Sequence, residues 1–318
     1  MHLRYLRASV TLLLLGVVSA CSIPLELEKL RKDTELKNIS VAIDNVPFYP
    51  QQDYQCGPAA LAMVLNWSGI EVSADRLVPL VFVPDRKGSF QAELIAASRT
   101  FGRIPYVIDP SLEALLIELE SGFPILVLQN LGLDWMPQWH YAIVTALDTG
   151  NETVRLHSGL NRDYKMSLET FLRTWSRARK WAILVLPPDR IASTAVAEKY
   201  ISSVMDFARV NKPEHTHIAL NNSVSRWPEN ITVRMALANF LFEQNDFSEA
   251  KIQFEQAIQI DDQYAPAHNN LANLLLRLKD YDVALQHAEK AVTLGGKFQA
   301  TYTQTLNEIN AAKNSSAE

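Results

Sequence analysis

The sequence lacks several features that would each assign the protein to a familiar class. It has only two cysteines, Cys21 and Cys56, among its 318 residues. Its formal net charge of -5 leaves no basic excess, which argues against nucleic acid as a partner. Beyond the N-terminal segment no run is apolar enough to cross a bilayer. There is no glycine-rich loop ending in Lys-Ser/Thr, so we predict neither ATP binding nor export by this chain alone.

The N-terminal residues 1–20 have the composition of a secretory signal peptide. Arg4 and Arg7 give a positive start, and a small-residue cleavage site, Ser19-Ala20, follows the apolar run. That run is far shorter than the ~20 residues needed to span a bilayer. Removal of the segment would take both arginines with it and make the chain more acidic. The remaining protein would then lie in an oxidising compartment.

The residues that close this segment carry a second signal. Val18-Ser19-Ala20-Cys21 resembles the lipobox of bacterial lipoproteins, which implies that Cys21 is lipidated and becomes the first residue. Several acyl chains on one residue would anchor the protein stably. Ser22 follows instead of Asp, which in enterobacterial-type sorting implies the outer membrane. We therefore predict a lipid-anchored protein of the bacterial cell envelope, on the periplasmic face of the outer membrane; an ordinary cleaved signal is the alternative.

The rest of the chain is long enough for about two domains. The charged residues 21–40 predict a tether or a short helix that lifts the first domain off the lipid. Residues 41–188 have helical patterns first and strand patterns second, which is an α+β order. The expected helices cover about 57–67, 73–80, 89–100, 112–120 and 168–175, and the expected strands about 124–129, 140–147, 153–157 and 181–186.

Cys56 is the candidate nucleophile of this domain. If Cys21 is the lipidated residue, Cys56 has no disulfide partner in its own chain. It also opens a predicted amphipathic helix, a position that lowers the pKa of a thiol and favours the thiolate. The alternative is that Cys56 is a small buried apolar residue.

A cysteine nucleophile needs a base and a site for the oxyanion. A histidine usually takes the thiol proton and later gives it to the leaving group. His140 opens a predicted strand, so a helix N-terminus could face a sheet edge, as in the papain layout. The Cys56 backbone N–H and a glutamine just upstream could donate hydrogen bonds to the oxyanion. His140 could also be an ordinary strand residue.

Two segments carry a specific family resemblance. Gln51 to Leu61, with Cys-Gly-Pro-Ala-Ala-Leu, and Trp139 to Val144 resemble the bacteriocin-processing type of papain-like cysteine peptidase. Members of that family cut after double-glycine leaders and are often fused to ABC transporters. The resemblance covers about residues 45–188. It implies a papain-like fold, a nucleophile at Cys56 and a base at His140.

The same resemblance places the oxyanion glutamine at Gln51. The gap from Gln51 to Cys56 is one residue shorter than the family's pattern, so Gln52 and Gln55 remain alternatives. Trp67, Trp135 and Trp139 could line a substrate groove, and packing in the core or at the rim is the equal alternative.

The third catalytic residue departs from the family, which places an Asp, usually before Pro, at the end of the strand after the histidine. Here that strand ends Leu156-His157-Ser158-Gly159. If the hairpin turns near Gly150, residue 140 lies opposite about 160. Asn161 could then orient His140 through its amide, and Ser158 could do so more weakly. Asp148 is eight residues along the same strand and too far away, and His157 is either structural or a rival base.

The C-terminal part, residues 189–318, repeats with a period of 34 residues. This is the period of tetratricopeptide repeats, with small residues where paired helices touch. Residues 196–226 are expected to add a divergent helix pair, and about 299–312 a closing helix. The matched segments are Ala238-Asn239-Phe240-Leu241 with Ala272-Asn273-Leu274-Leu275, Phe247 with Tyr281, Ala250 with Ala284, and Ala257 with Ala291.

The sequence thus predicts an α+β papain-like cysteine peptidase domain followed by an all-α tetratricopeptide-repeat domain. The leading function is a lipid-anchored peptidase that acts on a peptide or protein through a Cys56 thioester, with repeats that bind the substrate or a protein partner. A catalytically weak envelope scaffold is the main alternative, and acyl transfer to an amine is a third. No cofactor is expected, and His215 with His217 is too weak a pattern for a metal site.

Overall fold

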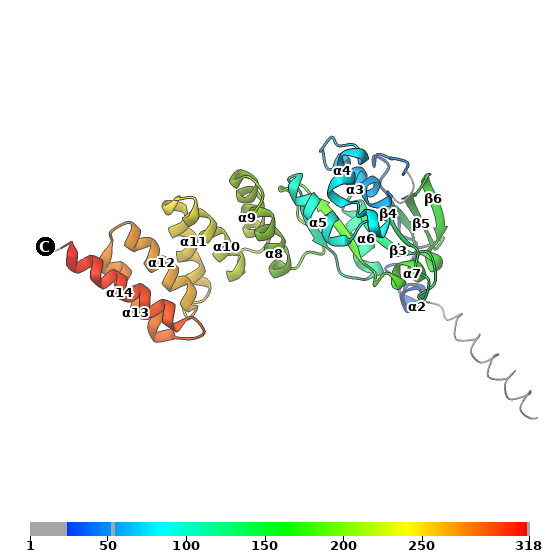
Figure 1. The fold of residues 1–318 in the computed structure, drawn as a ribbon. Helices are drawn as coiled ribbons and strands as arrows, with labels where there is room; N and C mark the ends of the chain where they lie inside the picture. The colour runs from blue at the N-terminus through cyan, green and yellow to red at the C-terminus, as the bar shows by residue number, and fades with distance from the viewer. Residues whose placement is uncertain (1–23, 52–54, 317–318) are drawn as a thin grey trace, which may run out of the picture. The chain divides into compact units, whose positions relative to one another are not determined.

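The computed structural model describes residues 24–51 and 55–316, and its first part is a sheet with helices packed on it (Figure 1). The predicted helices and strands of this region are confirmed within a few residues. The helices are α2 (Leu25–Lys32), α3 (Cys56–Trp67), α4 (Ala74–Val81), the 3-10 helix η2 (Pro84–Arg86), α5 (Gln91–Thr100), α6 (Leu112–Glu120) and α7 (Leu168–Arg177). The strands are β1 (Ser40–Ala42), β2 (Ile104–Val107), β3 (Ile125–Asn130), β4 (Trp139–Asp148), β5 (Thr153–Ser158), β6 (Asn161–Ser167) and β7 (Ala182–Leu186).

The strand order in the described sheet is β2-β7-β3-β4-β5-β6, and β1 pairs with the end of β4. The ladders of β4 with β3 and with β5 are antiparallel, as are those of β5 with β6 and of β3 with β7. Every residue of β3 is buried, because α3 and α7 both pack against this strand. Helices thus cover the central strand, whereas β6 is exposed along most of its length. The polar β6 has no apolar alternation, which is why the sequence did not predict it.

Local signals place the helices where the sequence predicts them. Serine side chains cap three helices: Ser73 accepts from the Arg76 N–H, Ser111 from Ala114 and Ser167 from Thr170. Helix α3 differs from the amphipathic helix that was expected. Its residues from Cys56 to Leu65 are all buried, so it is a core helix surrounded on all sides.

The segment before β1 contains a short helix, one of the two forms expected for it, and this helix, α2, is docked on the first unit. Leu27 and Leu30, three residues apart on one face, are both buried. The Arg31 guanidinium donates two hydrogen bonds to Glu152, at 2.7 and 2.8 Å, and Lys180 pairs with Glu26. Apolar burial and these ion pairs therefore fix α2 beside the β4–β5 turn. Residue 21, the predicted lipidation site, lies outside the described residues.

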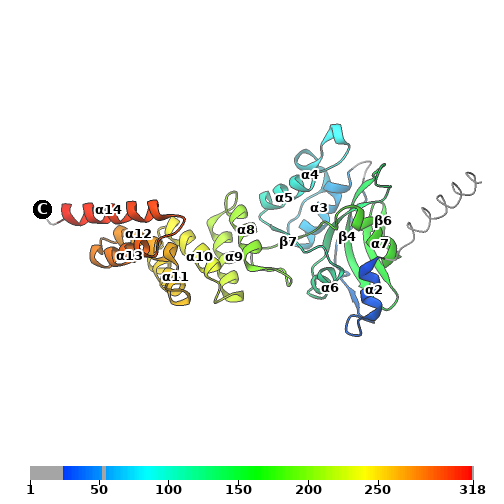
Figure 2. The same ribbon diagram turned by 90° about the horizontal axis from the view of Figure 1, so that it is seen from below.

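The chain divides into two compact units, residues up to 98 with 107–185, and residues 99–106 with 186 onward. The second unit is helical, and its helix pairs follow one another along the chain (Figure 2). The helix pair expected at 196–226 and the closing helix are both present. None of the helices within the described residues is both long and apolar enough to cross a membrane. The helices are α8 (Ala197–Ala208), α9 (Pro213–Arg226), α10 (Ile231–Glu243), α11 (Phe247–Ile260), α12 (Ala265–Arg277), α13 (Tyr281–Leu294) and α14 (Gln299–Ser315).

Small residues set the packing of the repeats. Ala250 and Ala284, which occupy the same repeat position, are fully buried, and so are Ala257 and Ala291. A methyl side chain lets two helix backbones approach closely, and a larger residue would force them apart. The turns also match, since Asn245 and Lys279 both have φ of 62°.

Two histidines join α12 to α13 inside the second unit. The His268 Nδ1 lies 3.0 Å from the His287 Nδ1, and the His268 Nε2 lies 3.0 Å from the Asp262 carbonyl oxygen. The carbonyl can only accept, so the His268 Nε2 carries the proton and its Nδ1 accepts from His287. Burial lowers the pKa of both histidines. Lys290 lowers the pKa of His268 further, Lys251 and His268 lower that of His287, and Asp262 opposes the shift at His268.

This histidine pair should make the repeats sensitive to acid. A folded-state pKa below the usual ~6.5 means that, below that pH, the unfolded chain binds more protons than the folded one. The contribution of this pair to the free energy of unfolding is therefore constant above pH ~6.5. It falls as the pH drops below that value, by about 1.4 kcal/mol per pH unit for the buried His268. Urea unfolding followed by circular dichroism at pH 7.5 and 5.5 measures this. The loss should shrink in His268→Gln and persist with the exposed control His215→Gln; equal losses in both variants would contradict the assignment.

Candidate active site

The candidate nucleophile Cys56 lies at the first residue of α3 and is buried, with 8% of its surface exposed. Pro58, in the first turn, has no N–H to leave unpaired, and the helix begins without a side-chain cap from Gln55. Hydrogen bonding from the backbone of Tyr141 lowers the pKa of the Cys56 thiol. Tyr141 follows His140 directly in the chain, and α3 packs against β4. The starts of α3 and β4 therefore lie close together, and the pairing of Cys56 with His140 stays a prediction.

The electrostatics of Cys56 differ from the expectation. Burial raises the pKa of the thiol, and hydrogen bonds from the backbone of Tyr141, Gly57 and Cys56 itself lower it without reversing the shift. Burial likewise lowers the pKa of His140. The direction of this shift runs against the expected stabilised thiolate, because desolvation disfavours the charged form of a buried thiol. Both shifts favour the neutral thiol and the neutral imidazole, a pair in which a base must take the thiol proton during the reaction.

His140 is held by Ser158. The His140 Nε2 lies 2.8 Å from the Ser158 Oγ, across the hairpin that joins β4 to β5. This contact leaves the other ring nitrogen, Nδ1, as the candidate base. Asn161 pairs with Ser158 at the start of β6, but its side chain is exposed and makes no hydrogen bond to His140. Of the two residues predicted to orient His140, the structure brings Ser158 to the ring and not Asn161.

Gln51 lies at the same end of the sheet. Its backbone N–H donates to the Gly159 carbonyl at 3.3 Å, and its side-chain Nε2 lies 3.9 Å from where a Gly159 Cβ would be. Gln51 is therefore next to the turn that follows Ser158. Gln55 is half-buried directly before Cys56, and Gln52 lies outside the described residues. The roles of Cys56, His140, Gln51, Ser158 and Asn161 in catalysis stay predictions.

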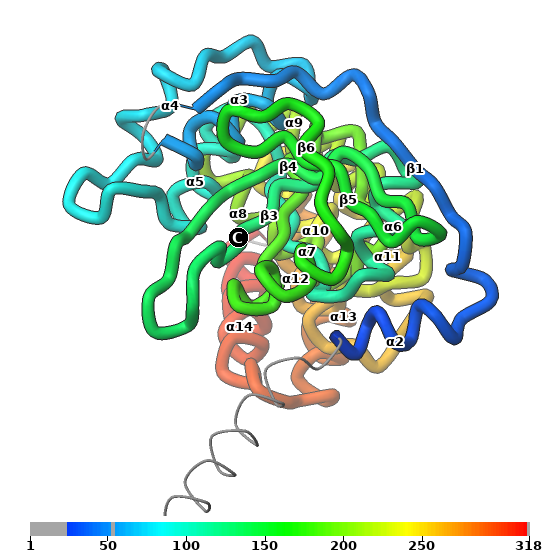
Figure 3. Tube along the Cα trace, turned by 90° about the vertical axis from the view of Figure 1, so that its right-hand side faces the viewer, coloured from blue at the N-terminus to red at the C-terminus, as the bar shows by residue number. Residues whose placement is uncertain are grey.

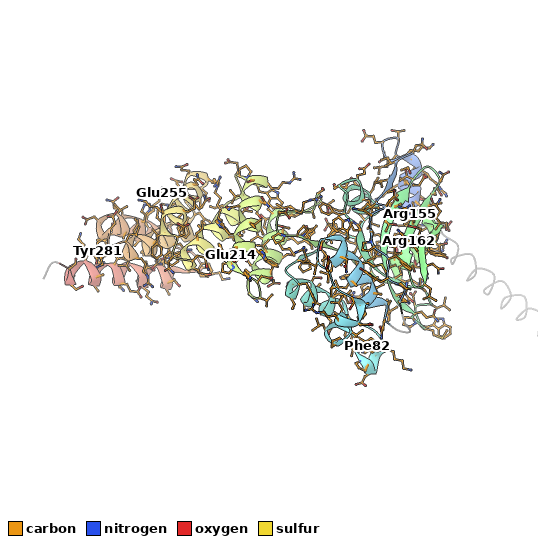
Figure 4. The ribbon with its side chains drawn as sticks, turned by 90° about the horizontal axis from the view of Figure 1, so that it is seen from above. Phe82, Arg155, Arg162, Glu214, Glu255 and Tyr281 are labelled. Carbon is orange, nitrogen blue, oxygen red and sulfur yellow. The ribbon has the colours of Figure 1, made fainter. Side chains whose placement is uncertain are left out.

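Both ring nitrogens of His157 are hydrogen bonded within the fold, so its role is structural. Its Nε2 donates to the Val46 carbonyl at 3.1 Å, and its Nδ1 accepts from the Asp163 N–H at 3.3 Å. Its ring also packs edge-on against Phe48. Arg155, labelled in Figure 4, holds Asp44 at 2.7 Å in the same region. Since both ring nitrogens of His157 are occupied, it does not compete with His140 as the base.

Ser89, Glu93 and Tyr141 complete the surroundings of Cys56, and the sequence did not predict them. The Tyr141 hydroxyl donates to the Ser89 carbonyl at 3.2 Å. Burial, together with the charges of Cys56 and Glu93, raises the pKa of Tyr141. The Ser89 Oγ and one Glu93 carboxylate oxygen are buried and have no hydrogen-bond partner among the described residues. Tyr141 acts on the thiol through its backbone, so no side-chain motif could reveal this effect.

Gly57 is required at its position because α3 lies very close to Ser89. A Cβ at residue 57 would lie 2.2 Å from the Ser89 Oγ and 2.6 Å from its Cβ. We expect Gly57→Ala to lower the free energy of unfolding by about 1–3 kcal/mol, the usual range for overpacking. Chemical denaturation measures the loss. The double variant Gly57→Ala/Ser89→Gly should recover most of it, and no recovery would mean that the clash is not the cause.

The described residues hold no group of three or more His, Cys, Asp or Glu that could bind a metal ion.

The comparisons with known proteins agree with this geometry. Residues 43–183 match the model of the Peptidase_C39 like family. Residues 231–264 and 269–295 match tetratricopeptide repeat models. The chain thus joins a domain that resembles C39-like peptidases to a helical region that resembles tetratricopeptide repeats. The predicted resemblance and the predicted fold class are both confirmed.

Several relatives cover one domain each. A C39-like peptidase from Bacillus anthracis is 20% identical, over 47% of this chain and 98% of that one, with a TM-score of 0.41. The TPR2B domain of yeast Sti1, solved in complex with pHsp70, is 20% identical over 36% of this chain and 96% of its own, with a TM-score of 0.34. Stress-induced-phosphoprotein 1 of Caenorhabditis elegans is 30% identical over 78 residues, and the match spans about a quarter of that protein.

Proposed function

We propose that the protein is a cysteine peptidase that hydrolyses peptide bonds through a thioester on Cys56. The observation that carries the proposal is the hydrogen bonding of the Cys56 thiol with the backbone of Tyr141, the residue after His140. His140, oriented by Ser158, takes the thiol proton as the sulfur attacks the carbonyl carbon. The same imidazolium returns the proton to the leaving amine, and water then hydrolyses the thioester.

The oxyanion of the tetrahedral intermediate needs donors at the start of α3. The first N–H groups of a helix have no partner within the helix and point outward. The Cys56 N–H is one such donor, and the Gln51 side chain at the Gly159 turn supplies the second in this proposal.

We also propose that the peptidase is lipid-anchored through Cys21 in the bacterial envelope. Leu27, the first fully buried side chain of α2, lies six positions after Cys21. Such a segment spans at most about 20 Å, so a docked α2 would hold the peptidase unit near the lipid surface. In this proposal the repeats bind the substrate or a protein partner. They hold a pocket of about 590 Å³ lined by Asn239, Asn270 and Tyr281 among others; Figure 4 labels Tyr281.

A catalytically weak scaffold is the second candidate, and one observation favours it. Among the residues that the structure describes, no carboxylate contacts the His140 ring, and burial shifts the pKa values of Cys56 and His140 toward a neutral pair. Hydrolysis of fluorescein-labelled casein by the chain from residue 22 onward separates the two candidates. A peptidase releases fluorescent fragments, and iodoacetamide or Cys56→Ser abolishes the release. If fragments form equally after either treatment, or not at all, the scaffold stands.

A further inference from the structure

The hairpin that joins β3 to β4 presents an unusual set of apolar side chains to solvent. Trp135 is 77% exposed and Trp139 is 55% exposed, and three more large apolar residues on the same hairpin are also exposed. Soluble proteins rarely leave so many large apolar side chains together on the surface without a binding role. We define the apolar hairpin as residues 131–139, whose exposed members are Leu131, Leu133, Trp135, Met136 and Trp139.

The apolar hairpin is well ordered by its own hydrogen bonds. The Asn130 Oδ1 accepts from the Gly132 and Gln138 backbone N–H groups at 3.0 and 2.9 Å. Leu133 and Met136 exchange backbone hydrogen bonds at 3.2 and 3.1 Å. A Cβ at Gly132 would lie 2.4 Å from the Met136 carbonyl oxygen. The apolar side chains are therefore presented on a fixed scaffold, which lowers the entropy cost of binding.

This surface continues into the candidate active site. Strand β4 begins at Trp139, and His140 is the next residue. The β5–β6 turn lies at the same end of the sheet, since Ser158 ends β5 and pairs with Asn161. That turn adds Leu160, which is also exposed. Exposed apolar side chains thus flank the His140–Ser158 pair from two turns.

The position of α2 argues against a membrane as the occupant. Helix α2 is fixed at the β4–β5 turn through Arg31 and Glu152. The apolar hairpin lies at the other end of β4, a strand of ten residues that is about 30 Å long. Figure 3 shows α2 and the green hairpin on opposite sides of this unit. An anchor before α2 would therefore hold the hairpin away from the lipid.

The charge of the hairpin agrees with this orientation. Its only charged residue is Asp134, and it has no lysine or arginine. Loops and helices that insert at anionic bilayers usually carry basic residues. A peptide with apolar side chains needs no such charge, and His140 follows directly on this surface in β4.

We propose that the apolar hairpin and Leu160 bind hydrophobic side chains of the peptide substrate and so determine its specificity. This proposal rests on the proposed peptidase function, because the surface is adjacent to His140, the proposed base. The substrate class is an extended or helical peptide segment rich in Leu, Met or Phe beside the scissile bond.

Binding can be measured without cleavage. Fluorescence anisotropy follows two pools of labelled twelve-residue peptides on the Cys56→Ala chain from residue 22 onward. One pool has Leu, Met or Phe at alternate positions, and the matched pool has Ser or Asn there. We expect the apolar pool to bind, and Trp135→Ser/Met136→Ser to raise its apparent Kd about 10- to 100-fold. The control Leu80→Ser, an exposed apolar residue of α4, should leave the Kd unchanged.

Several outcomes would overturn the proposal. Two concern the peptides: equal binding of both pools, or an unchanged Kd in the double variant. The other two concern other occupants: tighter binding to 3:1 phosphatidylethanolamine–phosphatidylglycerol vesicles than to the apolar pool, or a dimer that the double variant abolishes. The rate of Cys56 alkylation tests the peptidase function separately. Slow alkylation with Trp135-dependent binding would reject the catalysis and keep the surface, whereas fast alkylation without such binding would reject the surface alone.

Discussion

Replacing His140 with alanine should slow the reaction of Cys56 with iodoacetamide by about 10²-fold or more at neutral pH, the lower end of what a positioned base contributes. The reason is that burial favours a neutral pair, since it raises the pKa of the thiol and lowers that of the imidazole. Without the imidazole, little thiolate forms at pH 7. The measurement is the alkylation rate by mass spectrometry on the chain from residue 22 onward, in which Cys56 is the sole cysteine.

The pH profile of alkylation distinguishes the neutral pair from a preformed ion pair. A neutral pair reacts faster as the pH rises through neutrality, because deprotonation of both groups favours the thiolate. An ion pair instead keeps a fast, level rate down to about pH 5. His157→Gln is the matched control, since both nitrogens of His157 are bonded within the fold. An equal slowing by His157→Gln, or none by His140→Ala, would reject His140 as the base.

Replacing Ser158 with aspartate should make the site more reactive, by about 10-fold or more. A carboxylate at the Nε2 of His140 supplies the negative charge that the hydroxyl lacks, and an opposite charge at this distance shifts a pKa by about 1–3 units toward the charged form. The pKa of His140 should therefore rise, and the proton should stay on Nε2 with Nδ1 free to accept from the thiol. Nuclear magnetic resonance titration of His140 and the alkylation rate measure the two effects.

Two variants control the Ser158→Asp experiment. Ser158→Ala removes the 2.8 Å contact and should slow alkylation, and Asn161→Ala should change nothing because that side chain is exposed and makes no bond to His140. A slower Ser158→Asp protein with unchanged stability would mean that the hydroxyl is required as a donor, and our assignment of its role would be wrong. If Asn161→Ala slows alkylation as much as Ser158→Ala does, the Asn161 amide is the group that orients His140.

The sequence determined the elements that depend on local patterns. The spacing of apolar residues located α3, β3 and β4, and the 34-residue period located the repeats before any contact was known. The motif around Cys56 and the segment after Trp139 assigned the first domain to the C39-like peptidase fold. These signals are local because each element needs its own capping residue and its own apolar face.

The tertiary structure decided the properties that depend on neighbours distant in sequence. Burial of α3 on all sides, which the amphipathic pattern did not predict, raises the pKa of Cys56 although a helix N-terminus alone would lower it. The register of β5 against β4 places the Ser158 side chain, and not that of Asn161, within hydrogen-bond distance of the His140 ring. Docking favours the short helix α2 over a free tether, because Leu27 and Arg31 contact their partners only in the folded protein. Composition alone does not reveal which residues will be in contact or buried, since contacts between distant residues and desolvation arise only in the folded chain.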